Sequence, residues 1–233
     1  MPTDSQQLVV NLDFSRLIER SLPPLKLTER EVTGAGLVYS FTGPRSDEKF
    51  WAVVAVYADE TLASLAAQRQ VTRTSVGPSS TESSSHHDLV LWQTKDPLSG
   101  SLLLRRLNVV IRVNDGIPWS VRLRLVEQID QALQSGGPEV IHAKEVHPPQ
   151  ILNVKMPARI MPGERVQGEI EVANIAAADA LFGTENSNVL VTSGLKPTLS
   201  YYAPAQRAQD NIVLIISTPG NLLSKKTVTI EVK

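Results

Sequence analysis

The most constraining feature of this sequence is a series of short β-strand patterns that follows residue 150, where helical periodicity ends. Apolar and polar residues alternate most clearly at Val166–Val172 and Val228–Val232. Turn signals such as Pro162-Gly163 separate the runs. The complete set of runs is 151–156, 165–173, 188–192, 198–202, 211–217 and 226–232. Several short strands at this spacing predict a β-sandwich over residues 148–233.

The preceding residues mix strand and helix patterns. Phe50–Tyr57 is a dense run of valine, alanine and aromatic residues, and Asp59 is a candidate N-cap for a helix that ends near Gln70. The strongest helix is predicted over Pro118–Gln134, whose apolar residues recur at helical spacing. Further strands are expected over 31–42, 89–92 and 102–113, and helical spacing over 8–22. The order predicts an α+β domain over residues 1–147, with helices on one face of an antiparallel sheet.

Two segments are interpreted as linkers. Residues 76–85 are rich in serine and contain little that could be buried. Residues 138–150 contain His147-Pro148-Pro149 and are predicted to form a stiff connection between the two domains. The stretch Ala176–Phe182 is rich in alanine where the sandwich pattern calls for a strand, so its register stays open.

Composition excludes several classes of function. The chain has no cysteine, which excludes disulfides, thiolate nucleophiles and cysteine-bound metal centres. A net charge of -1 argues against nucleic acid as a partner. No apolar run approaches the roughly 20 residues that span a bilayer, and the first residues lack a signal-peptide pattern. We expect an extracellular or cell-envelope location if a leader was removed, and a cytoplasmic one otherwise.

The second domain resembles a bacterial immunoglobulin-like domain of surface and secreted proteins. The resemblance is carried by Pro162-Gly163-Glu164 before the strand Val166–Ala173 and by Tyr201-Tyr202-Ala203-Pro204. The closing strands Asn211–Thr218 and Lys226–Val232 complete it. This segment lacks the cysteine pair and core tryptophan of antibody domains. The first domain is faintly similar to small α+β domains of exported lipoproteins, through Trp51–Tyr57 and the helix that follows it.

No constellation in the sequence predicts catalysis or a cofactor. His86-His87-Asp88 offers metal ligands at the end of a serine-rich loop, but adventitious surface histidines are the favoured interpretation. The spacing of His142, Glu145 and His147 fits no zinc-binding motif, so we predict no metal site there either. The serines near His86 lack the Gly-x-Ser-x-Gly context of a nucleophile elbow.

The remaining candidates are arginines and tryptophans that could contact a ligand or partner. Trp92 and Trp119 border loops, where an indole could stack on a sugar or a protein, although core or hinge packing is the favoured interpretation. Arg105 and Arg106 belong to a basic concentration that includes Arg112, Arg122 and Arg124, for which a solvated charged face is favoured over anion binding.

We therefore expect a non-catalytic binding or structural module of a bacterial envelope or secreted system, which recognises a protein or glycan partner without spanning a membrane. Two alternatives stay open. The chain could be an accessory region of a larger hydrolase, or a structural assembly protein of the cytoplasm or a phage.

Overall fold

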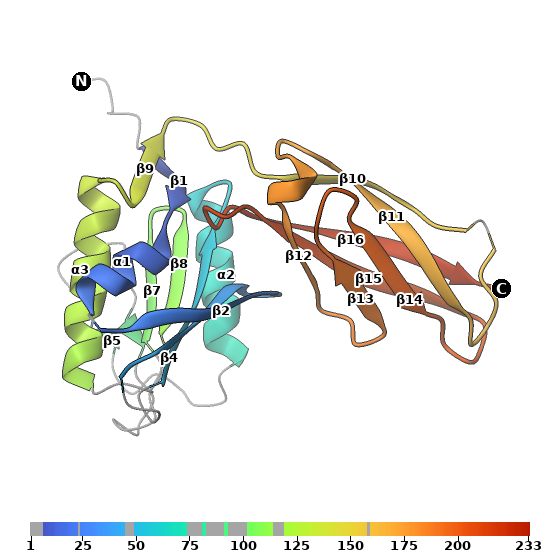
Figure 1. The fold of residues 1–233 in the computed structure, drawn as a ribbon, viewed down its shortest axis with the longest axis horizontal. Coiled ribbons are helices and arrows are strands. Elements are labelled where there is room, and N and C mark those ends of the chain that lie inside the picture. Colours follow the sequence, from blue (N-terminus) through green and yellow to red (C-terminus); the bar gives the residue numbers. More distant parts are fainter. Residues whose placement is uncertain are drawn as a thin grey trace. The chain divides into compact units, whose positions relative to one another are not determined.

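The computed structural model describes residues 7–22, 24–44, 49–73, 81–82, 91–92, 102–113, 119–157 and 159–233. The chain divides into two compact units, which we describe one at a time (Figure 1). The first unit comprises Met1–Glu31 and Ala35–His147. The second comprises Pro148–Lys233 together with Val32–Gly34.

The helices of the first unit are α1 (Phe14–Ser21), α2 (Glu60–Arg73) and α3 (Trp119–Ser135). Its strands are β1 (Leu8–Leu12), β2 (Lys26–Thr33), β3 (Gly36–Thr42), β4 (Lys49–Val56), β5 (Thr81–Glu82), β6 (Leu91–Trp92), β7 (Leu102–Arg106), β8 (Val109–Val113) and β9 (Val140–Ala143). The strands of the second unit are β10 (Gln150–Lys155), β11 (Arg165–Ala173), β12 (Leu181–Thr184), β13 (Val189–Thr192), β14 (Thr198–Tyr202), β15 (Ala208–Ser217) and β16 (Leu223–Val232).

The first unit is built on a five-stranded sheet in the order β2-β3-β4-β8-β7. Side chains alternate between its faces, so Leu104 and Ile111 lie on one side and Leu103 and Val110 on the other. The first of these faces carries the aromatic core, in which the ring centroids of Tyr39 and Phe14 are 5.2 Å apart. Phe41 and Phe50 continue this cluster. Burial of this face gives the sheet its main apolar core.

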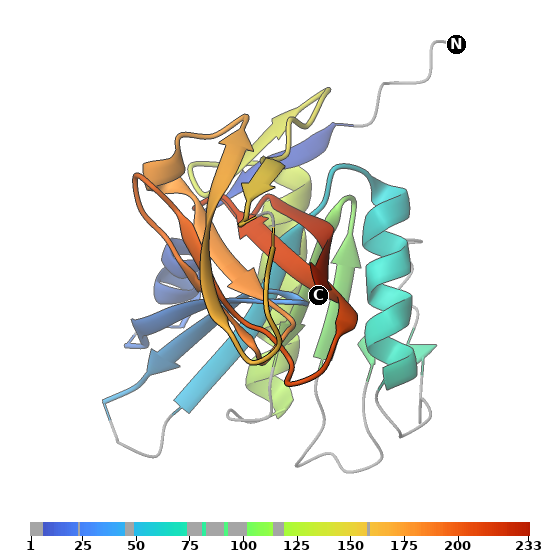
Figure 2. The same ribbon diagram turned by 90° about the vertical axis from the view of Figure 1, so that its right-hand side faces the viewer.

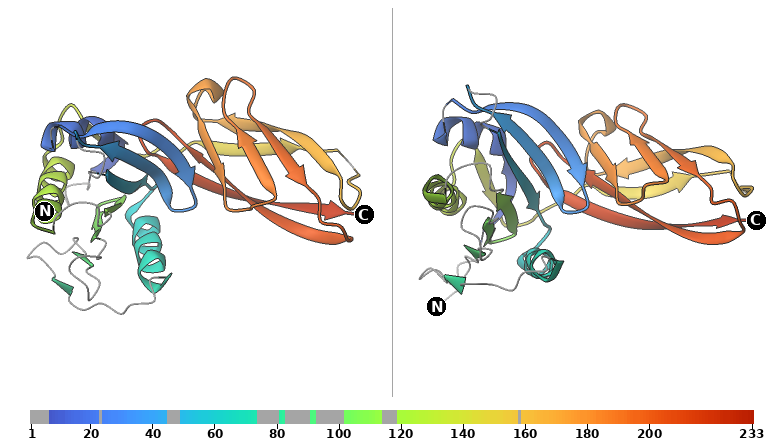
Figure 3. Two further views of the ribbon diagram at one scale, coloured as in Figure 1. Left: turned by 60° about the horizontal axis from the view of Figure 1, so that its bottom comes forward. Right: turned by 90° about the horizontal axis from the view of Figure 1, so that it is seen from below.

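The helices cover both faces of that sheet. Asp130 of α3 forms an ion pair with Arg106, which shares a face with Leu104, so α3 lies on the aromatic side. Ala63 and Ala67 of α2 pack against Leu103 and Val110 on the opposite side. The views in Figures 1 and 3 show β7 and β8 between the two helices. The expectation that the helices share one face is therefore wrong, because α2 uses its small residues to approach the second face closely.

Residues 102–113 form a hairpin and not one continuous strand. β7 and β8 are joined at Leu107-Asn108, where Leu107 has a φ of 50°. The Asn108 side chain is fully buried and bonds to the backbone of Val9 and Tyr57. A buried amide whose donors and acceptor are all bonded fixes the turn without an unpaired polar group.

The strands at the two ends of the first unit, β1 and β9, were not predicted from the sequence pattern. Residues 8–12 form β1 instead of the start of a helix, and α1 begins only after Asp13, whose carboxylate accepts from the Arg16 amide. The predicted linker contains β9, which pairs antiparallel with β1 from Leu8↔Ala143 to Leu12↔Val140 (Figure 2). Gly136, with a φ of 71°, ends α3 and allows the chain to turn into β9.

The second unit contains two antiparallel sheets, and all of the predicted strand runs are confirmed. One sheet has the order β10-β11-β14-β13 and the other the order β12-β15-β16. The alanine-rich stretch forms a short 3-10 turn at Ala177–Asp179 followed by β12, which supplies the missing strand. Inward-facing residues of both sheets, among them Val166, Leu199 and Ile216, form a single core.

A polar bridge accompanies this core. Tyr201 of β14 is fully buried, and its hydroxyl donates to the Asp210 carboxylate of β15 over 3.0 Å. The Asn188 side-chain amide donates to the same carboxylate oxygen over 2.9 Å. The two bonds tie the β13–β14 end of one sheet to the first residues of β15 in the other.

Candidate functional site

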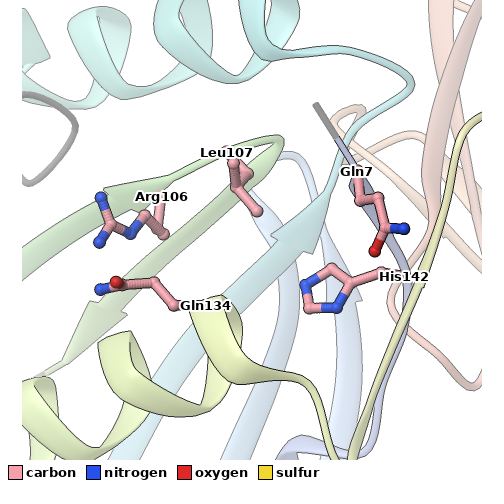
Figure 4. Close-up of a pocket in the computed structure, with 5 residues that line it drawn as sticks. All are labelled: Gln7, Arg106, Leu107, Gln134 and His142. Carbon is pink, nitrogen blue, oxygen red and sulfur yellow. The ribbon is translucent and has the colours of Figure 1, made fainter. Parts of the chain in front are cut away.

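The described part of the first unit holds a pocket of about 320 Å³ at the end of the β7–β8 hairpin (Figure 4). Its lining residues are Gln7, Arg106, Leu107, Gln134 and His142. They come from the segment before β1, the hairpin, the last turn of α3 and β9. The pocket therefore exists only because β9 and β1 are folded onto the end of α3.

Arg106 is held in the pocket wall by a buried acidic partner. Its Nε lies 2.8 Å from Oδ1 of Asp130, an ion-pair contact, and its Nη2 donates to Oδ2 over 3.4 Å. Gln134 Nε2 donates to the same Oδ2 over 2.6 Å. Arg106 and Asp130 are each only 7% exposed, so the positive charge is neutralised within the protein.

His142 is oriented by the end of α3. Its Nε2 lies 2.7 Å from the Leu133 carbonyl oxygen, which can only accept, so the proton is on Nε2. The Leu133 carbonyl is among the last four of the helix, which have no partner within the helix. The imidazole thus caps α3 and fixes β9 against it, while Gln7 lies beside the ring in Figure 4.

Four of the five lining residues have side chains that can form hydrogen bonds, and Leu107 is apolar. None is a carboxylate or hydroxyl nucleophile, and the imidazole proton is bonded to a backbone carbonyl. Arg106 is a predicted contact residue that lines the pocket, but its guanidinium also has a structural partner. The site is a small, mostly polar pocket in which Asp130 holds two lining side chains, Arg106 and Gln134.

The other predicted contact residues are Arg105, Trp92 and Trp119. Arg105 is its neighbour on β7 and so faces the opposite side of the sheet. Trp92 lies in β6, in register with Thr81, and Trp119 is the first residue of α3, but their side chains lie outside the described structure. Their contact roles stay predictions.

The expected solvated arginine face is wrong for part of the set. Arg106 and Arg122 are buried, with Arg122 only 1% exposed. The guanidinium carbon of Arg112 lies 5.3 Å from the Trp51 ring centroid, a cation–π contact. Of the five arginines in the set, Arg124 alone is exposed. The helical period places Arg122 inward and Arg124 outward, although both were expected at a solvated edge.

Of the two histidine clusters considered as metal sites, the structure describes one. His86, His87 and Asp88 lie outside the described residues, as do the serines before them. His147 and Glu145 are highly exposed and 3.9 Å apart, whereas His142 is bonded to α3. Within the described ranges, no group of three or more possible ligands is arranged to hold a metal ion.

A second candidate site is the β13 edge, which we define as strand β13 with the following residues Ser193–Leu195. Among the described strands, β13 is the last of its sheet and is paired with β14. Leu190 is 57% exposed and Leu195 is 83% exposed. Edge strands are normally protected by charges, proline or bulges. This one lacks all three, because residues 186–195 contain no charged residue and no proline.

The backbone of β13 directs hydrogen-bonding groups away from its own sheet. The Tyr202 amide donates to the Asn188 carbonyl, which makes Asn188 and Tyr202 a hydrogen-bonded pair. In an antiparallel ladder such pairs alternate, so Leu190 also bonds to β14. Val191 therefore points its N–H and C=O away from β14. Strand β12 of the other sheet also lies close to β13, and the Phe182 amide donates to the Ser193 hydroxyl over 3.2 Å.

The opposite edge of the same sheet differs. β10 has a register irregularity between Ile151 and Asn153 and ends in Lys155, which forms an ion pair with Glu171. Hydrogen bonding and the Lys155 charge lower the pKa of Glu171. A bulge and a charged pair protect β10 from strand addition, and β13 has neither.

Neither the pocket nor the β13 edge was predicted as a site from the sequence. The pocket depends on β9, whose strand pattern is only four residues long. One sequence feature marks the β13 edge: residues 186–195 form an uncharged run bounded by Glu185 and Lys196. Nothing in the sequence states that this run lies at an edge, because the strand order is a tertiary property.

No family model matches the chain, and a comparison with curated proteins gives no match. Across the part of the chain that the structure covers, no helix has the length and apolar character needed to cross a membrane.

Proposed function

We propose that this protein is a non-catalytic binding module that recognises an extended segment of a protein partner by adding it to the β13 edge. The single observation that carries the proposal is the exposure of Leu190 on an uncharged edge strand whose Val191 backbone groups point outward. An added strand would satisfy such groups in pairs, which is the basis of β-augmentation.

We further propose that the second unit is an immunoglobulin-like sandwich. Lettered in chain order, its seven strands β10 to β16 become A to G, and the two sheets have the orders A-B-E-D and C-F-G. Immunoglobulin domains of the constant type have the same distribution. In this scheme β13 is strand D, at an edge. The first unit, an α+β domain, is the second half of the proposed module.

The side chains around the edge favour an apolar partner strand. Leu190 lies opposite Ser200 on the outer face, next to Tyr202, whose ring is stacked by Arg165 at 5.0 Å. Val191 faces inward and is only partly buried. An added strand would therefore cover Leu190 with one side chain and Val191 with the next, so we expect consecutive apolar residues in the partner.

The cellular setting rests on the resemblance to bacterial surface and secreted domains alone. We propose an envelope or secreted system on that basis. The test of the binding function does not depend on this placement.

Selection of random peptides displayed on phage against the full chain tests the function. We expect enriched peptides with three or more consecutive apolar residues, and we expect them to slow hydrogen exchange at the Val191 amide. Leu190→Lys should abolish binding, since a charge would replace the exposed leucine. Thr227→Lys is the matched control, because Thr227 is exposed on the outer face of the other sheet.

Peptides that bind equally well to Leu190→Lys would place recognition elsewhere and contradict the proposal. Specific binding of a glycan array in place of any peptide would favour the glycan alternative.

A further inference from the structure

We infer that the pocket at the end of the β7–β8 hairpin binds an uncharged, hydroxylated small molecule of the size of one sugar ring. The pocket belongs to the first unit, whereas the β13 edge belongs to the second. The inference therefore goes beyond the proposed function and does not depend on it. It gives the protein a second binding site, for a small molecule.

The walls of the pocket come from separate parts of the first unit. Gln7 precedes β1, Leu107 lies in the turn after β7, Gln134 lies in the last turn of α3, and His142 lies in β9. The volume of about 320 Å³ is at the lower end of the roughly 300–1,000 Å³ that small-molecule sites occupy. A pocket of this volume suits a ligand of about one ring.

The charges at the pocket favour a neutral ligand. Arg106 is the one described lining residue with a permanent charge, and its Nε lies 2.8 Å from Oδ1 of Asp130. An anion would be attracted by Arg106 and repelled by the carboxylate behind it, and a cation would meet the reverse. Both members of the pair are 7% exposed, so they present little net charge to the pocket. A neutral molecule meets neither repulsion.

The two glutamines suit a ligand that carries hydroxyl groups. Each side-chain amide has an oxygen that accepts and an NH₂ group that donates. Gln134 Nε2 donates to Asp130 Oδ2 over 2.6 Å, which holds this amide in place. In the view of Figure 4, the amides of Gln7 and Gln134 lie at opposite ends of the pocket. A hydroxyl both donates and accepts, so a ring with hydroxyls around its rim can bond to both amides.

The remaining lining residues supply an apolar contact and a fixed wall. Leu107 is half-buried in the hairpin turn, where its side chain can pack against the C–H groups of a sugar ring. His142 is held by the Leu133 carbonyl over 2.7 Å. Because His142, Arg106 and Gln134 are each bonded to a protein group, a ligand would have to order few side chains when it binds.

Sugars that differ only in charge test the electrostatic argument. The neutral probes are glucose, galactose and mannose, and the charged probes are protonated glucosamine and glucuronate, each of which differs from glucose at one substituent. In NMR titrations of the full chain, we expect at least one neutral sugar to bind. Both charged sugars should bind at least about fivefold more weakly, since each meets one like charge of the Arg106–Asp130 pair.

Side-chain amide signals in the same titrations locate the bound sugar. The signals of Gln7 and Gln134 should shift, whereas the signal of Gln128, at an exposed position of α3, should not. Gln7 is itself exposed, so Gln7→Ala should leave the unit folded, which circular dichroism checks. This variant should weaken binding by about 2- to 10-fold, the effect of one hydrogen bond. The matched control, Gln128→Ala, should leave the affinity unchanged.

Three results would overturn the inference. The first is that none of the neutral sugars binds. The second is that a charged sugar binds as tightly as the best neutral one. The third is that Gln7→Ala has no larger effect than Gln128→Ala, which would place the sugar elsewhere. Leu190→Lys separates this site from the proposed function, because it should abolish peptide binding and leave the affinity for the sugar unchanged.

Discussion

The side chain of Asn108 pairs with the backbone of Val9 as a neighbouring strand would. Its Oδ1 accepts from the Val9 amide over 2.9 Å, and its Nδ2 donates to the Val9 carbonyl over 2.8 Å. The same Nδ2 donates to the Tyr57 carbonyl over 2.8 Å. β1 is thus held by β9 on one side and by a single side chain from the β7–β8 turn.

Asn108→Asp should destabilise the first unit by about 2–4 kcal/mol. The substitution keeps the acceptor for Val9 but removes both donor bonds and leaves a carboxylate among carbonyl oxygens in a buried site. Urea denaturation monitored by circular dichroism measures the change. Gln128→Ala, at an exposed position of α3, is the control and should have an effect within about 0.5 kcal/mol. Equal stability of the two variants would show that the amide does not hold β1.

Asp130→Asn should cost about 3–5 kcal/mol, because it leaves the Arg106 guanidinium buried without its counter-charge. Adding Arg106→Met should recover much of the loss, since the double variant removes both buried charges. A double-mutant cycle of unfolding free energies measures the coupling. Additive effects would show that the two side chains do not interact energetically.

Gly36→Ala should destabilise the first unit more than Gly163→Ala destabilises the second. Both glycines have positive φ, 143° and 76°. A Cβ at Gly36 would overlap the Val54 carbonyl oxygen, whereas a Cβ at Gly163 has open space. We expect about 1 kcal/mol for Gly163→Ala from backbone strain alone, and at least twice that for Gly36→Ala. Thermal unfolding of each variant gives the comparison, and a larger loss at Gly163 would contradict it.

The free energy of unfolding should fall as the pH rises from 10 to 12. Burial raises the pKa of Tyr57 to about 12 against an opposing effect of the Arg69 charge. Burial also raises the pKa of Tyr201 to about 12, with the Asp210 hydrogen bond and charge acting in the same direction. Because the folded-state pKa values lie above the usual 10.0, the stabilisation is complete below pH 10 and is lost as pH rises through about 12.

Chemical denaturation across this range measures the pH dependence, and Tyr201→Phe should make it shallower. A phenolate absorbance titration of the folded protein should show these two groups ionising late. Ionisation of all tyrosines near pH 10 would contradict the burial argument.

The sequence pattern predicted elements whose signal is local. β4 could be predicted because apolar residues fill it almost continuously. α2 could be predicted because Asp59 is a candidate N-cap, and in the structure its carboxylate accepts from the Leu62 amide. α3 combined helical spacing with a glycine stop. In the second unit, alternation identified the strands because each has one face in the core and one in solvent.

The parts that failed depend on contacts distant in sequence. β9 is a strand because β1 is available to pair with it, and β12 follows an alanine-rich turn that carries no strand signal. Leu62 and Leu65, the two leucines of α2, are 45% and 46% exposed. Ala63 and Ala67 pack instead, because small residues let the helix approach the sheet, a choice that hydrophobicity alone does not reveal.

The pairing of Leu8 with Ala143 also sets the order of events when the chain is synthesised. β1 is synthesised before β9, the last described strand of its unit, and lacks this partner strand until β9 has been made. Contacts of such long sequence separation form late in folding and slow it. A nascent chain should therefore be unable to complete its first unit while Val140–Ala143 are still inside the ribosome, and it should become resistant to protease in a single step once those residues have emerged.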